Sequence, residues 1–473
     1  MNNKLSVTNL SVKYENYKNY ILEDVNFDLA GNEVVSIIGE SGCGKTTLAK
    51  AIAGLLPASA IKNGEILIDG TDVLSLKKSD LSKVRGKKIG LTFQDSFASL
   101  NPTLKIWSQM KYVLKEKYKQ ENYKFIYNKA CSVLKLVGLI DCHRILQSYP
   151  AELSGGTNQK INFALSIIQE PDVLILDEPT SSLDILSQEE ILKIIQYLCS
   201  YKKMTIIFIT HNILLAARIS DKIIIMRNGH NIESCSRNSF NTFDFKNEYA
   251  ISLYNDALLH RNNNSKNTSP ITKLIEFSNV SKTFSGKKVI NNTSFAIARG
   301  ESFGLIGRTG SGKSTICKLI CGIYKADCGT IKIDNKTRIE MVFQNPNSSI
   351  NPYRSIQDSL NENCIISKSK RYSESFLLEY IKSFGLPEDT LHKIPSQLSG
   401  GQKQKIAIIR ALLNQPDIII FDEPTSSLDV TSQKNILNII KEIQTKYLLT
   451  YIFISHNPNV IEYMCDRHVV VGH

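Results

Sequence analysis

Four short runs of uninterrupted apolar residues stand out along the chain, and each leads into a glycine-rich turn or an acidic pair. The runs cover residues 34–38, 173–176, 303–306 and 418–421. Strands that are apolar on both faces, with helical segments between them, are typical of a parallel sheet covered by helices on both sides. The pattern therefore predicts an α/β fold built around parallel sheets.

A single internal repeat organises the chain. The segment LSGG at 153–156 recurs at 398–401, and DEPTSSLD at 177–184 recurs at 422–429, both with an offset of 245 residues (398 − 153). Earlier matches have larger offsets, mainly because the first copy carries an extra segment at 70–88. The repeat predicts two domains of the same fold in tandem.

The composition changes between the two copies. Residues 260–270 are polar, rich in Asn and without apolar periodicity, which is typical of a flexible linker. Residues 246–259 alternate at helical spacing and predict a helix that packs on the first domain. We therefore expect a first domain at 1–259, a linker at 260–272 and a second domain at 273–473.

Both copies contain a glycine-rich loop of the form GxxxxGK[ST] directly after an apolar run, at 39–46 and 307–314. Glycines at this spacing let backbone N–H groups surround phosphate oxygens at the start of a helix. The lysine is expected to reach the β- and γ-phosphates, and the hydroxyl residue after it to ligate Mg²⁺. One match can arise by chance, but two matches after two strands favour nucleotide binding. The candidate nucleotide-binding residues of these loops are Gly39, Ser41, Gly42, Gly44, Lys45, Thr46, Thr47, Gly307, Thr309, Gly310, Gly312, Lys313, Ser314 and Thr315.

An acidic pair follows a later apolar run in each copy. Asp177 and Asp422 end the predicted strand, where a carboxylate can hold Mg²⁺ through water. Glu178 and Glu423 follow directly, and each is placed to accept a proton from an attacking water. Such a pair also suits the N-cap of the next helix. In company with a phosphate-binding loop, however, it favours a metal ligand followed by a general base.

A histidine follows each acidic pair at the same distance. His211 lies 33 residues beyond Glu178 (211 − 178), and His456 lies 33 residues beyond Glu423 (456 − 423). Each directly follows an apolar run and so belongs at the end of a strand. A lone histidine there is usually an ordinary loop residue, but the matched spacing favours a sensor of the γ-phosphate.

A further motif lies between each glycine-rich loop and its acidic pair. LSGGTNQ (153–159) and LSGGQKQ (398–404) resemble the signature of the ATP-binding-cassette (ABC) transporter family, and SSLD (181–184 and 426–429) resembles its D-loop. The likeness covers essentially the whole chain apart from the linker. It implies two tandem P-loop ABC ATPase domains, each a mainly parallel sheet core with an antiparallel β subdomain and an inserted α-helical subdomain.

The resemblance also implies roles for further residues. In the family, each ATP lies between the P-loop of one half and the signature of the other, so the halves of this chain are expected to form an intramolecular sandwich. The matching signature residues are Ser154, Gly155, Gly156, Ser399, Gly400 and Gly401. Tyr14 and Phe284 match the aromatic residue that stacks on adenine. The implied Mg²⁺ ligands are Thr46, Gln94, Asp177, Ser314, Gln344 and Asp422, of which Gln94 and Gln344 are the Q-loop glutamines. The implied catalytic residues are Glu178, His211, Glu423 and His456.

The regions around the two Q-loop glutamines indicate a branch of the family. FQDSFASLNP (93–102) and FQNPNSSINP (343–352) resemble importers of peptides, nickel and metal-chelating opines. The first copy departs from the general signature at Thr157, as the first of two paired ATPases does in these importers. The chain therefore resembles both ATPases fused, at the cytoplasmic face of the membrane, with two integral membrane permease subunits and an extracytoplasmic solute-binding protein as partners.

The alternative is a soluble tandem ABC ATPase that acts on ribosomes, which would also suit the net charge of +12. The linker here is short and Asn-rich rather than long, helical and charged, which favours the importer. The basic runs at 77–88 and 367–371 are broken and lack aromatic stacking positions, so we expect no nucleic acid partner. No apolar stretch of about 18 residues predicts a membrane-spanning helix.

Ten cysteines are scattered without a CxxC pair, so no zinc site is expected. Cys43 lies inside the first glycine-rich loop and leaves two interpretations open. Nearby N–H donors and Lys45 would favour its thiolate and make it reactive. Alternatively it is a small filler, equivalent to Ser311 in the second copy.

Overall fold

The structure is a computed structural model. It describes residues 3–15, 17, 19–93, 99–180, 185–257, 273–284, 286–307, 310–334, 337–346, 349–362, 364, 371–426 and 428–471. The chain divides into two compact units, 1–257 and 258–473, and each is described by itself.

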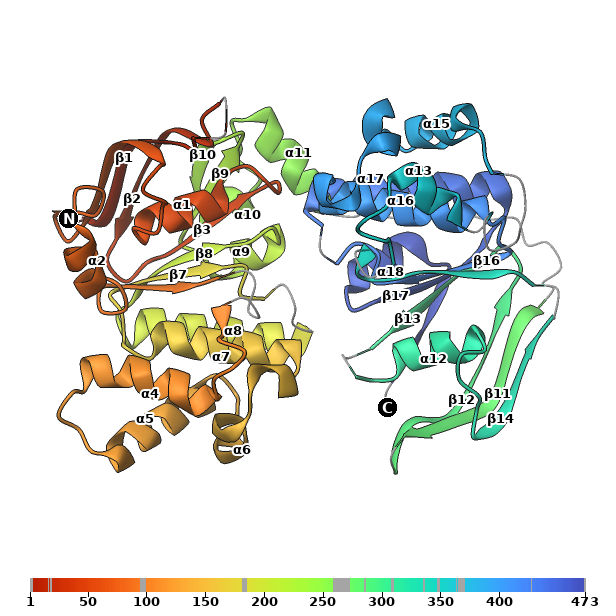
Figure 1. Cartoon of the computed structure of the whole chain (residues 1–473), viewed down its shortest axis with the longest axis horizontal. Helices are drawn as coiled ribbons and strands as arrows, with labels where there is room; N and C mark the ends of the chain where they lie inside the picture. The colour runs from red at the N-terminus through yellow and green to blue at the C-terminus, as the bar shows by residue number, and fades with distance from the viewer. Residues whose placement is uncertain are drawn as a thin grey trace. The chain divides into compact units, whose positions relative to one another are not determined.

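The first unit contains two sheets (Figure 1). Its strands are β1 (Asn3–Lys13), β2 (Leu22–Ala30), β3 (Val34–Gly39), β4 (Ile61–Ile68), β5 (Thr71–Asp72), β6 (Ile89–Thr92), β7 (Val173–Asp177), β8 (Thr205–Ile209), β9 (Lys222–Arg227) and β10 (His230–Ser236). One sheet is antiparallel, in the order β2-β1-β4-β5. The other has the order β10-β9-β3-β8-β7-β6 and is parallel except for its β10 edge.

The helices of the first unit cover the parallel sheet and form a subdomain of their own (Figure 1). They are α1 (Lys45–Ile52), α2 (Lys78–Val84), α4 (Ile106–Lys117), α5 (Tyr123–Leu136), α6 (Cys142–Gln147), the 3₁₀ helix η1 (Pro150–Glu152), α7 (Gly155–Ile167), α8 (Ile185–Ser200), α9 (Ile213–Ile219), α10 (Arg237–Asn241) and α11 (Glu248–Ala257). The helical subdomain consists of the helices from α4 to α7, which are inserted between β6 and β7.

The second unit repeats this architecture. Its antiparallel sheet has the order β12-β11-β14, and its parallel sheet has the order β15-β16-β17-β13-β18. The strands are β11 (Lys273–Phe284), β12 (Lys287–Ala298), β13 (Ser302–Ile306), β14 (Cys328–Ile333), β15 (Ile339–Val342), β16 (Ile418–Asp422), β17 (Thr450–Ser455) and β18 (Arg467–Val470). The helices are α12 (Lys313–Ile320), α13 (Ile356–Leu360), α15 (Glu374–Ser383), η3 (Glu388–His392), η4 (Pro395–Gln397), α16 (Gly400–Leu413), α17 (Val430–Tyr447) and α18 (Pro458–Met464).

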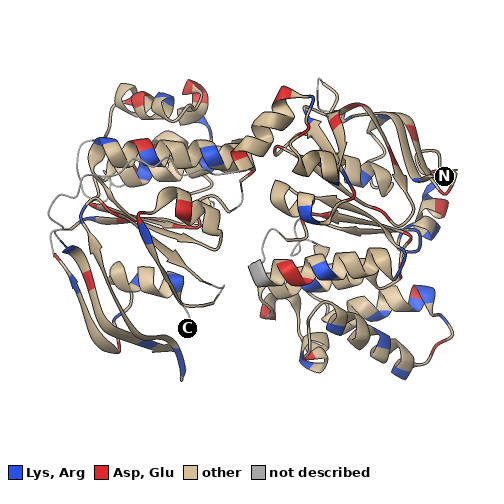
Figure 2. Ribbon diagram, turned by 180° about the vertical axis from the view of Figure 1, so that it is seen from behind, with Lys and Arg blue, Asp and Glu red and all other residues tan. Residues whose placement is uncertain are grey.

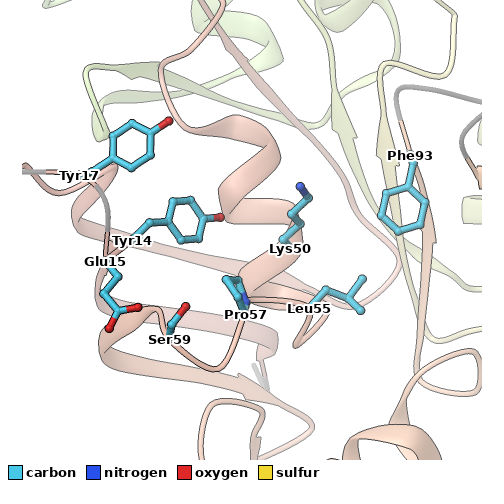
Figure 3. A pocket seen from close by; sticks show the side chains of 8 residues that line it. All are labelled: Tyr14, Glu15, Tyr17, Lys50, Leu55, Pro57, Ser59 and Phe93. Carbon is cyan, nitrogen blue, oxygen red and sulfur yellow. The ribbon is translucent and has the colours of Figure 1, made fainter.

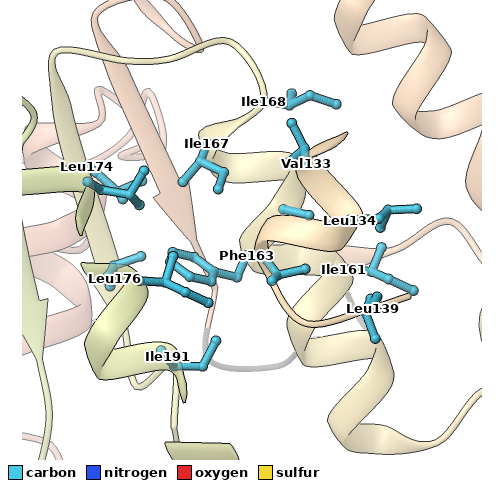
Figure 4. Close-up of a cluster of buried hydrophobic side chains, with 14 of the residues drawn as sticks. Val133, Leu134, Leu139, Ile161, Phe163, Ile167, Ile168, Leu174, Leu176 and Ile191 are labelled. Carbon is cyan, nitrogen blue, oxygen red and sulfur yellow. The ribbon is translucent and has the colours of Figure 1, made fainter. Parts of the chain in front are cut away.

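The apolar runs are continuous because both faces of each parallel sheet are covered. In β7, Leu174 and Leu176 enter the core shared with the helical subdomain. Val173 and Ile175 point the other way, into the core under the antiparallel sheet. Figure 4 shows Phe163 of α7 beside Leu174 and Leu176, where its ring is 2% exposed. Each such buried side chain contributes roughly 1.5–3 kcal/mol. The predicted α/β class with mainly parallel sheets is thus confirmed.

Candidate nucleotide-hydrolysing site

The first glycine-rich loop joins β3 to α1, and close packing dictates its glycines. A Cβ at Gly39 would lie 2.3 Å from the backbone oxygen of Met226, on the neighbouring strand β9. Gly44 has a φ of 105° at the N-cap of α1, and a Cβ there would meet Leu22 at 2.7 Å. Only glycine lets the chain turn at these positions while its backbone amides stay open to a ligand.

The lysine of each loop is buried and held by loop carbonyls. The Lys45 side chain is 7% exposed, and its Nζ donates to the carbonyl oxygens of Gly39 at 2.8 Å and Glu40 at 2.7 Å. In the second unit, Lys313 Nζ donates to the Gly307 oxygen at 2.7 Å. Both units thus place a fixed ammonium group inside the curl of the loop, where it can attract phosphate.

The strand-end aspartates lie beside the hydroxyl group that follows each lysine. Ser314 Oγ donates to Asp422 Oδ2 at 3.3 Å. Burial raises the pKa of Asp177 to about 6; the charge of Glu178 adds to this effect, and a hydrogen bond from Thr46 opposes it. Burial likewise raises the pKa of Asp422.

This donor set fits magnesium. The described residues contain no cluster of three or more His, Cys, Asp or Glu side chains that would form an all-protein metal site. Mg²⁺ is commonly held by one or two carboxylates together with substrate phosphates and water. One hydroxyl and one carboxylate beside a phosphate-binding loop match this preferred set of ligands.

The glutamate after each aspartate contacts the predicted histidine. A distance of 3.2 Å joins Glu178 Oε1 to His211 Nδ1, and the same distance joins Glu423 Oε1 to His456 Nδ1. Burial would raise the pKa of Glu423, but the hydrogen bond and charge of His456, with the charge of Lys313, lower it overall. A carboxylate held ionised next to an imidazole is suited to accept a proton from water.

Both glutamates also have a strained backbone that the sequence did not predict. Glu178 has a φ of 50° and Glu423 a φ of 47°, in the left-handed region that non-glycine residues rarely adopt. The Glu178 amide donates to the backbone oxygen of Ile209, and the Glu423 amide donates to that of Ile454, each at 3.0 Å. Both acceptors lie in the strand that precedes the histidine. Such strain costs on the order of 1–3 kcal/mol and is concentrated at functional sites.

The Q-loop glutamine of the second unit reaches the same carboxylate. Gln344 Nε2 donates to Glu423 Oε2 at 2.9 Å and to Ser426 Oγ at 3.4 Å. The structure therefore brings the predicted Q-loop, acidic pair and D-loop of this unit together. The corresponding predictions for Gln94 and for 181–184, and the prediction for Thr309, fall outside the described residues.

The two signature motifs open helices and are capped differently. In α16, Ser399 Oγ accepts from the Gln402 amide at 3.3 Å, and Gln402 Oε1 accepts from the Ser399 amide at 3.0 Å. In α7, Ser154 Oγ accepts from the Thr157 amide at 3.2 Å, but the two side-chain hydroxyl oxygens lie 2.8 Å apart. Only the second signature has a complete capping box.

Tyr14 lines a pocket of about 630 Å³ whose other residues the sequence did not single out (Figure 3). Tyr17 lies near Tyr14, with ring centroids 6.3 Å apart, while Phe93 stands on the opposite side. Lys50 of α1 lies between them, one helical turn and a half from the glycine-rich loop. The remaining lining residues are Glu15, Leu55, Pro57 and Ser59. In the second unit, Phe284 instead packs against Tyr324 at 5.1 Å.

The first glycine-rich loop is supported from behind by β9 and α11. The Gly229 amide donates to the Cys43 oxygen at 3.1 Å. The Arg227 guanidinium lies 4.5 Å from the ring centre of Tyr249 in α11, and the buried Tyr249 hydroxyl group lies beside Glu40 of the loop. The predicted helix at 246–259 is thus present as α11, packed on the first unit. Sequence periodicity found the helix but gave no sign of its contact with the loop.

The structure favours the filler interpretation of Cys43 over the reactive one. The residue is 6% exposed, and burial raises the pKa of its thiol above the ordinary value despite the opposing charge of Lys45. Its Sγ would lie 2.9 Å from a Cβ at Gly39, so it fills space inside the loop.

Two loop-and-carboxylate sites of the same construction in one chain define a tandem P-loop ATPase. The family model described as ABC transporter matches residues 22–181 and 290–426. A second model, described as an AAA domain, matches the overlapping segments 146–217 and 393–462. The chain belongs to the ABC transporter family, and as an ATP-binding protein of that family it hydrolyses ATP to power transport.

Curated relatives match along nearly the whole chain. The ABC transporter ATP-binding protein YejF of Escherichia coli (strain K12) is 31% identical over 99% of this chain and 93% of its own. The peptidoglycan transport ATP-binding protein YejF of Agrobacterium fabrum is 30% identical over 99% and 91%. The oligopeptide transport ATP-binding protein OppD of Mycobacterium tuberculosis is 25% identical over 99% and 93%.

A solved structure of the archaeal ribosome recycling factor aABCE1 with the stalk protein aP1 has a TM-score of 0.68. The sequence of that factor is 22% identical to this one, and the match covers 95% of this chain and 84% of the solved chain. At this identity the likeness supports the fold alone. Within the described residues, no helix is long and apolar enough to cross a membrane.

Proposed function

We propose that the chain drives import of a peptide-containing solute through two integral membrane permease subunits, fed by an extracytoplasmic solute-binding protein. The observation that carries this proposal is the full-length match to relatives named for oligopeptide and peptidoglycan transport. Peptides, nickel and metal-chelating opines are the solute classes indicated by the Q-loop regions, and the relatives favour peptides. The chain would then act at the cytoplasmic face of the membrane, as a peripheral protein held by its permeases.

The proposed chemistry follows from the geometry of each unit. Loop amides and Lys45 bind the phosphates. Thr46 and Asp177 would hold Mg²⁺, which would offset the negative charge of the phosphate oxygens. Glu178 accepts a proton from the attacking water, and His211 keeps the carboxylate in place. Lys313, Ser314, Asp422, Glu423 and His456 take the same roles in the second unit.

Each site is proposed to be completed by the signature of the opposite unit. Ser399 to Gly401 would then face the first glycine-rich loop, and Ser154 to Gly156 the second. The amides at a helix N-terminus carry partial positive charge, which suits contact with a γ-phosphate. The Tyr14 pocket is proposed to receive the adenine of the first site, and Phe284 to stack on that of the second.

The test measures uptake in cells that carry the permeases and the solute-binding protein. Lys45→Ala and Lys313→Ala each remove a cation beside the transferred phosphate, which typically costs about 10²–10³ in rate. Each single variant should suppress more than half of the uptake. A double variant that transports at full rate would refute the proposed coupling of hydrolysis to import.

A further inference from the structure

The helical subdomains of the two units differ in charge. In the sequence of the first unit, residues 106–136, which contain α4 and α5, carry seven lysines and two glutamates, a net charge of +5. In the second unit, residues 356–383, which contain α13 and α15, carry four basic and four acidic residues, a net charge of 0. Figure 2 shows several basic segments on the α4–α5 hairpin. Two copies of one fold have therefore acquired different surfaces at the same place.

An aromatic cluster lies on the same hairpin. The ring of Trp107 lies 5.2 Å from that of Tyr123 and 5.4 Å from that of Tyr127, both in edge-on geometry. Lys111 Nζ lies 6.0 Å from the ring centres of both Trp107 and Tyr123. Tyr123 of α5 is 59% exposed, and Tyr112, which follows Lys111 in α4, is 72% exposed. Aromatic side chains with polar tips thus stand among cations at the surface.

Intramolecular ion pairs account for only some of these cations. Glu170 pairs with Lys117 at 3.3 Å and with Lys129 at 3.0 Å. Three exposed lysines around the hairpin turn make no ion pair with any described residue: Lys115, Lys119 and Lys124. The hairpin therefore presents positive charge that its own unit does not neutralise.

We propose that the α4–α5 hairpin binds the anionic headgroup surface of a phospholipid membrane. Lysines contact lipid phosphates, while Tyr112 and Tyr123 enter the headgroup region, where amphipathic rings are favoured. Each Lys near such a surface contributes about 1 kcal/mol, or about fivefold in binding. A nucleic acid fits less well, because Trp107 and Tyr127 pack edge-on against each other rather than offering free faces to bases.

This inference rests on the proposed function, which brings the chain to a membrane through its permeases. The hairpin would add a direct contact between the first unit and lipid, with no counterpart on α13 and α15. Because that contact needs no permease, it can be measured on the purified chain. Its failure would leave the uptake test with Lys45→Ala and Lys313→Ala untouched, so the two proposals can fail separately.

The first experiment measures co-sedimentation of the full chain with vesicles. Vesicles of phosphatidylglycerol and phosphatidylcholine should bind the chain in low salt, and vesicles of phosphatidylcholine alone should not. The triple variant K115Q/K119Q/K124Q should bind roughly a hundredfold more weakly. The matched control K62Q/K287Q/K288Q loses the same charge from exposed strand positions and should bind within about threefold of the unmodified chain.

The second experiment uses Trp107, which is the only tryptophan in the sequence. Its emission should shift to shorter wavelength with anionic vesicles, and Tyr112→Ser should weaken binding without changing ATP hydrolysis in solution. Absence of both binding and shift would overturn the proposal, and so would equal losses in the two triple variants. Binding to an acidic polypeptide with none to lipid would assign the hairpin to a protein partner and also overturn it.

Discussion

The different caps of the two signature helices predict unequal ATP sites. In the proposed arrangement, the second P-loop site receives the α7 signature, where Thr157 stands in place of the glutamine that completes the α16 cap. The missing bond from a side-chain oxygen to the Ser154 amide is worth about 1 kcal/mol. In addition, the Ser154 hydroxyl has Thr157 Oγ1 at 2.8 Å as a competing partner. Together these effects should slow that site by roughly tenfold or less.

Single-site proteins make this difference measurable. Glu423→Gln leaves the first site working and Glu178→Gln leaves the second, so with permeases present Glu178→Gln should cost more ATP turnover. Adding Thr157→Gln to the Glu178→Gln protein should restore the capping box and raise its turnover. Adding Gln402→Thr to the Glu423→Gln protein should lower its turnover by a similar factor.

A smaller substitution separates the two causes. Thr157→Val keeps the shape of the side chain but removes the competing hydroxyl, so an increase in turnover would assign the effect to Ser154. Equal losses from Glu178→Gln and Glu423→Gln would refute the reasoning, as would a Thr157→Gln variant that leaves the slow site unchanged.

Four further predictions follow from burial and charge. Because burial raises the folded-state pKa of Asp177 to about 6 from an ordinary 3.8, this carboxyl lowers stability as pH rises between about 4 and 6. Asp177→Asn should therefore raise the free energy of unfolding of the nucleotide-free chain by up to about 3 kcal/mol at pH 7.5 and by much less at pH 4.5. Denaturant titration at the two pH values measures this, and equal gains at both would contradict it. Phe163→Ala should cost about 3–5 kcal/mol in the free energy of unfolding, measured by denaturant titration, because the ring is 2% exposed in the helical core. Iodoacetamide should label exposed Cys328 much faster than buried Cys43, as mass spectrometry of peptides would show; equal rates would reopen the reactive interpretation. The purified chain should co-purify with permeases that stimulate its ATPase, whereas ribosome co-sedimentation retained at moderate salt would favour the ribosomal alternative.

The parallel sheets and the glycine-rich loops could be predicted from sequence because their determinants are local. A continuous apolar run such as 173–176 reports burial on two faces, and the loop motif reports a backbone shape. Matched spacing singled out Glu178 and His211 as site residues but did not predict that they touch. Their 3.2 Å contact required the strands β7 and β8 to be neighbours, which sequence spacing does not encode.

Other features of the site depend on segments that are distant along the chain. The left-handed backbone of Glu178 occurs together with a hydrogen bond from its amide to Ile209 on another strand. The pocket beside Tyr14 includes Phe93, which follows β6 and is far from Tyr14 in sequence. The contact that supports the loop likewise depends on Tyr249 of the distant helix α11. The choice between the two interpretations of Cys43 has the same origin, because the sequence shows the nearby lysine but not the burial that opposes its effect on the thiol pKa.

The presence of both compact units in one polypeptide has a consequence for assembly. Units made as separate chains could pair like with like, and two first units would join two Thr157-type signatures. A covalent connection supplies each unit with its unlike partner at an effective concentration that does not fall when the protein is diluted. It also fixes the ratio of the two units at one to one, whatever the level of expression. A chain cut between residues 257 and 273 should therefore lose ATP turnover on dilution, while the intact chain should not.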